Sequence, residues 1–279
     1  MSTGADGNSK NQPTSLAVRL AFGLLILWLV LPLIPIAIWS LAKRWFFPDL
    51  LPGEWSLQAW HYLFSSVSGL DKAILASFAI AVPVTLIACL IGIPAGRALA
   101  CYDFRGKRFV QLLVLAPVLV PGIAVITGLH GIMLTLELNN QITGVIIAHL
   151  IPALPYMILV MTSTFSRFDT EFEAQARTLG ASALQVFFRV TLPAILPGVV
   201  IGALFTFLVS WSQYILTLIV GGGRVVTLPL LLFNFVSAGR NDVAGALGVI
   251  FILPGLIILI TVARYISGRS GIAELPSRL

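Results

Sequence analysis

The chain has 279 residues, of which 58% are hydrophobic and 10% are charged, and its mean hydropathy is +1.00. Ordinary soluble domains are about 45–50% apolar and about 25% charged, so a soluble fold of this length could not bury so much apolar surface. The composition excludes a soluble globular protein and predicts an all-α polytopic membrane protein. The net charge of +6 is explained by the bias of basic residues described below, so it does not indicate nucleic-acid binding.

Six apolar runs are long enough to cross the hydrocarbon layer, which takes about 20 helical residues. The predicted spans cover residues 18–42, 74–99, 109–135, 141–164, 194–220 and 243–266. The polar residues 1–16 are expected to be disordered. The segment 17–42 is predicted to be an uncleaved span, because its apolar run is too long for a secretory signal and no cleavage site follows it.

Lys and Arg set the predicted orientation, because the cytoplasmic segments of membrane proteins carry an excess of both. With the N-terminus inside, twelve of the 17 basic residues fall in inner segments and five in outer segments. Both termini are therefore predicted to be cytoplasmic, including the tail 267–279.

The first outer segment, residues 43–73, contains four amphipathic aromatic residues of the kind found at membrane interfaces: Trp45, Trp55, Trp60 and Tyr62. We expect a short amphipathic helix near Ser56–Phe64. An interfacial anchor is favoured there over a binding site.

Prolines punctuate spans two to four and are expected to kink them: Pro83, Pro94, Pro117, Pro121, Pro152 and Pro155. The middle of each span lacks Asp, Glu, Lys and Arg, which disfavours an ion-driven carrier. His130 and His149 are the titratable candidates, and hydrogen-bonded packing is the favoured interpretation of both. Cys89 and Cys101 have no metal-binding spacing, so neither a metal site nor a catalytic residue is predicted.

The fourth loop, residues 166–193, is unusually polar and predicts two short helices of about ten and about eight residues. Thr170 with Glu173, and Ser182 with Gln185, each fit a capping box. Gly180 is expected to end the first helix. Pro193 is expected to stop the second helix and begin the fifth span.

Both predicted helices carry an apolar stripe, formed by Phe172, Ala176 and Leu179 in the first and by Leu184, Phe187 and Phe188 in the second. Glu173 and Arg177 are spaced for an i,i+4 ion pair. Helices this short need a surface to pack on. A cytoplasmic protein partner is favoured over the lipid surface, which stays the alternative.

The spacing of this loop resembles the cytoplasmic signature of type I binding-protein-dependent permeases of ABC importers: E-A-A, three residues, Gly, nine residues, I-x-L-P. Here nine residues follow Gly180 before Val190-Thr191-Leu192-Pro193. The chain departs from the signature at Ala174, where the family usually has Glu; Glu173 lies one residue earlier.

The resemblance implies a type I permease fold with a core over residues 74–266, in a bacterial inner membrane, with 43–73 in the periplasm. It implies that the loop docks on an ATPase through nine residues: Glu173, Ala176, Arg177, Gly180, Ala181, Ser182, Leu184, Phe187 and Phe188. The implied partners are two cytoplasmic ATPase subunits, a second permease chain and a periplasmic substrate-binding protein. The chain lacks a Walker A pattern, so ATP and Mg²⁺ would be used by the partner and no cofactor is expected here.

Within the fifth span, Ser210–Tyr214 interrupts an apolar run with polar and amphipathic residues that face lipid only at a cost. The predicted substrate pathway comprises Trp211, Gln213, Tyr214, Tyr156 and His149, and interhelical hydrogen bonding is an equal alternative. The chain most resembles polyamine-type permeases, which carry an acidic patch here. Gln213 replaces an acid, so polyamine is the leading substrate class, with thiamine, phosphonate and ferric iron as alternatives.

Two hypotheses of other classes stay open from the sequence. A lipid-modifying membrane enzyme would use His130 and His149 as bases. A membrane scaffold would bind a cytoplasmic partner without transport. The spacing of the loop favours the importer over both.

Overall fold

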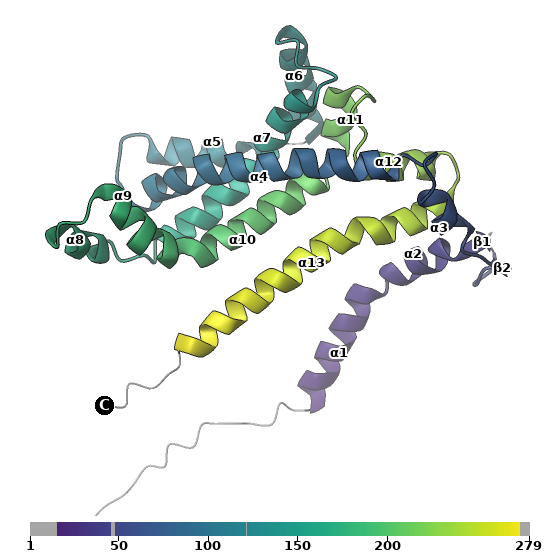
Figure 1. Ribbon diagram of the computed structural model, residues 1–279, viewed down its shortest axis with the longest axis horizontal. Helices are drawn as coiled ribbons and strands as arrows, with labels where there is room; N and C mark the ends of the chain where they lie inside the picture. The colour runs from purple at the N-terminus through teal and green to yellow at the C-terminus, as the bar shows by residue number, and fades with distance from the viewer. Residues whose placement is uncertain (1–15, 46–47, 121, 274–279) are drawn as a thin grey trace, which may run out of the picture.

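The computed structural model describes residues 16–45, 48–120 and 122–273, so most of the predicted disordered segment 1–16 lies outside it. Helices make up nearly all of this part of the chain (Figure 1). In chain order the elements are α1 (Leu16–Val30), α2 (Leu33–Ser40), β1 (Ala42–Arg44), β2 (Glu54–Trp55), α3 (Gln58–Leu63), α4 (Leu70–Cys101), α5 (Lys107–Leu119), α6 (Gly122–Thr135), α7 (Ile142–Phe165), α8 (Glu171–Thr178), α9 (Ala183–Val186), the π-helix η1 (Phe187–Thr191), α10 (Leu192–Trp211), α11 (Ile215–Gly221), α12 (Leu228–Ser237) and α13 (Asn241–Ala273).

Four helices in the described residues are long and apolar enough to cross a bilayer: α4, α7, the continuous run α9–η1–α10, and α13. Two bent pairs, α1 with α2 and α5 with α6, bring the number to six when each pair counts as one span. The first pair bends by 43°, so the first predicted span is not one straight helix. The last helix continues to Ala273, so the tail predicted from residue 267 begins as helix.

The helices of spans two and four are continuous through the prolines that are expected to kink them. The helix α4 runs for 32 residues through Pro83 and Pro94, and α7 runs for 24 residues through Pro152 and Pro155. A proline removes one backbone N–H, but a helix packed against neighbours can continue around it. In span three the helix α5 does end shortly after Pro117, and Pro121 lies outside the described residues.

One of the core clusters of the molecule lies where α7 packs against α4 and α10, around buried Met157, Met161 and Ile195. Glycines on α4 allow this close approach. A Cβ atom added at Gly92 would lie 2.6 Å from Met157 Cγ, and one at Gly96 would lie 2.5 Å from Met161 Cβ. Membrane helices associate in this way because small residues let their backbones come close without an aqueous hydrophobic effect.

The long helices give the molecule two ends. In Figure 1 the short helices α8 and α9 lie at one end of the bundle, and α3 with the β1–β2 hairpin lies at the other. The helices α1 and α13 diverge from the bundle. The side chains of α1 described from Val18 onward are exposed, an apolar surface suited to lipid or to another membrane helix.

The outer segment contains the predicted short helix, which is α3, within the expected Ser56–Phe64. It also contains a β-hairpin that the sequence does not predict: β1 pairs antiparallel with β2, and Lys43 Nζ lies 2.9 Å from Glu54 Oε2. Strands of three and two residues are too short to leave a pattern of alternation in the sequence.

Candidate functional site

The helix α8 begins differently from the prediction. Thr170 occupies the N-cap position but its side chain makes no capping hydrogen bond, so the first predicted capping box is wrong. Asp169 Oδ1 instead accepts a hydrogen bond of 2.9 Å from the backbone N–H of Glu171. The Glu173 carboxylate points into the protein and has other partners, described below.

The end of α8 is as predicted, although the helix has eight residues rather than about ten. Gly180 has a φ of +85°, which a residue with a Cβ adopts only under strain. The backbone N–H of Gly180 donates to Arg177 O and that of Ala181 to Ala176 O, the two bonds of a Schellman motif. Gly180 therefore turns the chain sharply between α8 and α9.

The second capping box is confirmed at α9. The backbone N–H of Gln185 donates to Ser182 Oγ at 3.3 Å, and the backbone N–H of Ser182 donates to Gln185 Oε1 at 2.9 Å. The stop predicted at Pro193 is wrong, because α9 continues through η1 directly into α10. The wider π-helical turns precede a proline whose nitrogen cannot donate, and such turns absorb local changes of helical register.

Glu173 is the most unexpected feature of the loop, because it is a buried carboxylate that joins three elements. Arg97, near the end of α4, donates to it through both guanidinium nitrogens, Nη1 to Oε1 at 3.0 Å and Nη2 to Oε2 at 2.6 Å. Thr191, the last residue of η1, donates its hydroxyl to Oε1 at 2.5 Å. The Arg97 guanidinium also lies 5.8 Å from the centre of the Phe165 ring at the end of α7. We call Arg97, Glu173 and Thr191 the carboxylate link.

Glu173 is ionised in this arrangement. Burial alone would raise the pKa of Glu173, but the hydrogen bonds from Arg97 and Thr191 and the charges of Arg97 and Arg177 outweigh it and hold the pKa below its usual range. A lowered folded-state pKa means that the link stabilises the fold above the carboxyl's ordinary pKa, and that this contribution is lost as the pH falls through the lowered value. The link is therefore intact at neutral pH.

The carboxylate link replaces the predicted ion pair between Glu173 and Arg177. Glu173 turns inward to Arg97, and the side chain of Arg177 has no hydrogen bond or ion pair in the part of the chain that the structure describes. Arg97 and Thr191 were not predicted as site residues. Arg97 is 76 positions from Glu173 in the sequence. An arginine near the end of a membrane span is common on the cytoplasmic side, so its presence alone does not indicate a functional site.

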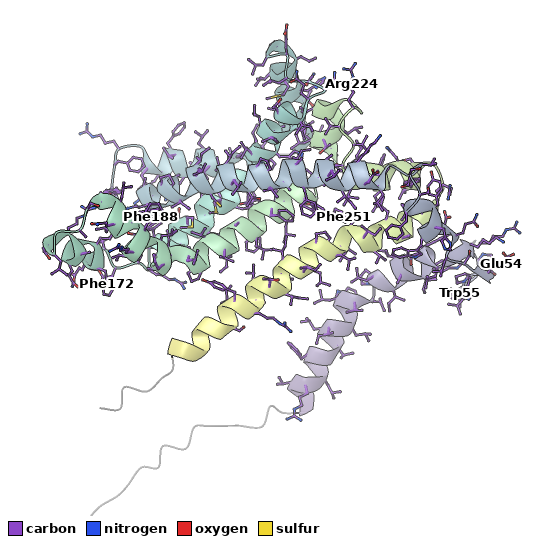
Figure 2. The ribbon with its side chains drawn as sticks, in the orientation of Figure 1. Glu54, Trp55, Phe172, Phe188, Arg224 and Phe251 are labelled. Atoms are coloured by element: carbon purple, nitrogen blue, oxygen red, sulfur yellow. The ribbon has the colours of Figure 1, made fainter. Side chains whose placement is uncertain are left out.

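Four of the six residues in the predicted apolar stripes are exposed. The exposed fractions are 57% for Phe172, 89% for Leu179, 71% for Leu184 and 60% for Phe188. Figure 2 shows Phe172 and Phe188 at the same end of the molecule, opposite Glu54 and Trp55. Of the other predicted coupling residues, Arg177, Gly180 and Ser182 are exposed, and Ala176, Ala181 and Phe187 are half-buried. Phe172, Leu179, Leu184 and Phe188 form what we call the apolar loop face.

Span five is broken where the sequence places its polar residues. The helix α10 ends at Trp211 and α11 begins at Ile215, so Ser212–Tyr214 is not helical. Gln213 and Tyr214 are half-buried at this break. The ring centre of Tyr214 lies 4.4 Å from that of Phe233 on α12.

Trp211 is a packing residue rather than a group open to a pathway. It is 4% exposed, it stacks on Phe207 and Phe251, and its Nε1 donates to Phe251 O at 3.1 Å. Figure 2 shows Phe251 on the side of α13 that faces α10. Tyr156 is half-buried on α7, one helix away from the break.

His149 bridges the two sides of the break. From α7, its Nδ1 lies 3.0 Å from Ser210 Oγ on α10 and its Nε2 lies 3.0 Å from Thr217 Oγ1 on α11. Thr217 donates its own hydrogen to Gln213 O, so it accepts from Nε2–H, and Nδ1 is left to accept from Ser210. All three side chains are buried. We call His149, Ser210 and Thr217 the histidine bridge.

The hydrogen bonds of the histidine bridge fit the packing interpretation of His149. Both ring nitrogens have partners, as expected for hydrogen-bonded packing, and neither is free to act as a base. Ser210 and Thr217 were not singled out in the sequence, since a Ser or Thr within a span is ordinary. Among the described residues, no group of three or more His, Cys, Asp or Glu side chains is placed to hold a metal ion.

Comparison with known proteins identifies the chain. It is 30% identical over 225 residues to the putrescine transport system permease protein PotI of Escherichia coli, covering 77% of this chain and 79% of the relative. It is 36% identical over 146 residues to the molybdate/tungstate transport system permease protein WtpB of Pyrococcus abyssi, covering 51% of this chain and 55% of that protein.

The fold has a close counterpart in the crystal structure of a bacterial ABC transporter involved in the import of the acidic polysaccharide alginate. The TM-score is 0.69 at 20% identity, covering 90% of this chain and 95% of that one. Residues 88–271 match the family described as binding-protein-dependent transport system inner membrane component. This family consists of permease subunits, so the importer hypothesis is favoured over the membrane-enzyme and scaffold hypotheses. The chain belongs to this family and is an inner-membrane permease subunit of an ABC importer.

Proposed function

We propose that this chain translocates a small solute into the cytoplasm by alternating access, driven by an ATPase that docks on residues 166–193. The observation that carries the proposal is the apolar loop face, held out at one end of the bundle by a loop that is fixed from inside by the carboxylate link. Exposed apolar residues beyond the ends of the spans need a partner to cover them. Membership of the family of importer permeases supports an ATPase as that partner.

The carboxylate link supplies a route from the docked surface to the spans. A displacement of α8 acts on Glu173, and through it on Arg97 of α4 and on Thr191 at the start of the span-five helix. In this proposal Glu173 acts inside the chain. The docking contacts come from Ala176, Arg177, Gly180, Ala181, Ser182, Leu184, Phe187 and Phe188, joined by Phe172 and Leu179.

The assembly we propose has two ATPase subunits, which bind ATP and Mg²⁺, and a second permease subunit of different sequence. A periplasmic binding protein delivers the substrate at the end that carries α3 and the β-hairpin. The excess of Lys and Arg supports an orientation with the loop and both termini in the cytoplasm. The diverging α1 and the outer half of α13 are available to lipid and to the second permease.

The substrate class we propose first is a polyamine, since PotI is named as a putrescine permease. The break in span five, with Gln213 and Tyr214, is the proposed contact region, held by the histidine bridge. A small oxyanion is the second candidate. WtpB is named for molybdate and tungstate, and Gln213 can donate a hydrogen bond to an anion where an acid would repel it. Thiamine, phosphonate and ferric iron stay further alternatives within the same class.

The test is a reconstitution. The tagged chain is purified from its source organism in mild detergent, and the proteins retained with it are identified by mass spectrometry. The complex is placed in vesicles, and uptake of labelled putrescine, spermidine and molybdate is measured with ATP and with each candidate binding protein. An ATPase in the complex and ATP-dependent uptake of one solute are expected. A chain that retains no ATPase, even after crosslinking at the loop, would contradict the proposal.

A further inference from the structure

A cleft separates the cytoplasmic end of α4 from α8. Its volume is about 460 Å³, and it is lined by Arg97, Cys101, Tyr102, Thr170, Glu173, Ala174 and Arg177. Thr170, at the N-cap of α8, and Ala174 and Arg177 within it lie about one turn apart, so one face of α8 forms a wall of the cleft. The side chain of Ala174, in the middle of this wall, is a single methyl group and leaves space in the cleft.

The cleft carries an excess positive charge. Its lining holds two guanidinium groups and one carboxylate. Both oxygens of Glu173 are occupied by Arg97, and one also accepts from Thr191. Arg177 is left exposed without an ion pair in the residues that the structure describes. Glu171 is poorly placed to pair with Arg177, because a separation of six residues puts the two side chains about 120° apart around the helix.

Docking changes the environment of Arg177. In the docking proposed above Arg177 is itself a contact residue, although it lies about 140° around the helix from Phe172 and lines the cleft instead of the apolar loop face. A guanidinium that loses its water needs a paired anion, because an arginine never loses its proton in compensation. Among the described residues no free carboxylate lines the cleft, which makes the docked partner the proposed source of the anion.

We propose that an Asp or Glu side chain of the cytoplasmic ATPase enters this cleft and forms an ion pair with Arg177. The inference rests on the proposed function, and it adds the chemistry of one contact. The permease supplies the cation and the ATPase supplies the anion. The planar guanidinium suits a bidentate carboxylate, and the short side chain of Ala174 leaves room for it.

A zero-length crosslink tests the contact directly. The Arg177→Lys variant is assembled with its ATPase and treated with a carbodiimide, which joins an amine to an adjacent carboxylate as an amide with loss of water. Mass spectrometry of the peptides is expected to show position 177 joined to one Asp or Glu of the ATPase. The matched control is Arg105→Lys, an exposed basic position on the loop between α4 and α5, which is expected to give no such product.

Charge reversal gives the second measurement. Arg177→Glu is expected to reduce ATPase retention and uptake at least tenfold, and Arg105→Glu to change neither by more than twofold. Reversing the crosslinked acid of the ATPase to Arg should restore uptake to Arg177→Glu. Undiminished retention by Arg177→Glu would overturn the ion pair and leave the proposed function standing. A loss seen only in vesicles containing phosphatidylglycerol would also overturn it, in favour of a lipid phosphate. Failure of the unaltered chain to retain ATPase would instead contradict the proposed function.

Discussion

The two ends of the span-five helix are held by different chemistry. At the loop end, the ionised Glu173 joins α8 to Arg97 and Thr191. At the other end, the break at Ser212–Tyr214 is bridged by His149 through neutral hydrogen bonds. An ion pair near the membrane surface keeps some contact with water, whereas a charge within a span is costly. The same helix is therefore fixed by an ion pair where it meets the loop 166–193 and by neutral groups at its other end, within the predicted span.

The largest expected effect comes from removing the cation of the carboxylate link. Arg97→Ala leaves Glu173 buried without its partner, a change that costs about 3–5 kcal/mol for a fully buried pair and less here, because Arg97 is 27% exposed. We expect uptake to fall at least tenfold while ATP hydrolysis continues. Uptake and hydrolysis are measured together in vesicles, with Arg97→Lys as the conservative variant expected to retain part of the uptake.

The apolar loop face gives the next effect. Leu184→Ser and Phe188→Ser each remove exposed apolar area from the proposed docking surface, and each is expected to weaken ATPase binding about tenfold, or about 1.4 kcal/mol. The control is Leu75→Ser, at 69% exposed on α4 near the opposite end of the molecule. Binding to the ATPase is measured in detergent. Equal losses for all three variants would point to general destabilisation instead of docking.

The histidine bridge is expected to have an intermediate effect. His149→Leu leaves the hydroxyl groups of Ser210 and Thr217 without their shared partner, and interhelical hydrogen bonds in membranes average about 0.6 kcal/mol each. We expect a several-fold loss of uptake with near-normal ATPase binding. His149→Gln, which can donate and accept, should recover part of the loss. The two His149 variants are thus expected to lose uptake while keeping ATPase binding, whereas the loop-face variants are expected to lose ATPase binding first.

The smallest expected effect on uptake is at the turn between α8 and α9. Gly180→Ala meets no neighbouring atom, so its only cost is the left-handed backbone, about 1–2 kcal/mol. Faster amide exchange over 171–186 is the expected readout, together with a modest loss of uptake. Gly53→Ala, which also meets open space and whose φ is not positive, should leave exchange unchanged. Unaltered exchange at the turn would mean that the Schellman motif does not hold the loop.

Local patterns predicted most of this fold. The lengths of the apolar runs predicted the spans. Ser182 predicted the capping box of α9 and Gly180 predicted the end of α8, because both features depend on residues close in sequence. The carboxylate link and the histidine bridge were out of reach, because each depends on which helix faces which and joins residues up to 76 positions apart. The same limit explains the errors at Thr170 and Pro193. A capping side chain and a helix-stopping proline are local preferences, and packing of Glu173 and of the continuous helix overrode both.

The most direct test of the account is a double-variant cycle across the carboxylate link. Solute uptake per ATP hydrolysed is measured in vesicles for the unaltered chain, Arg97→Met, Glu173→Gln and the two together, with ATPase retention measured in parallel. The account predicts that each single variant lowers uptake per ATP, that the double variant is no worse than either, and that ATPase retention is unchanged. Additive losses accompanied by loss of the ATPase would contradict it, because Glu173 would then be a docking residue and not an internal link.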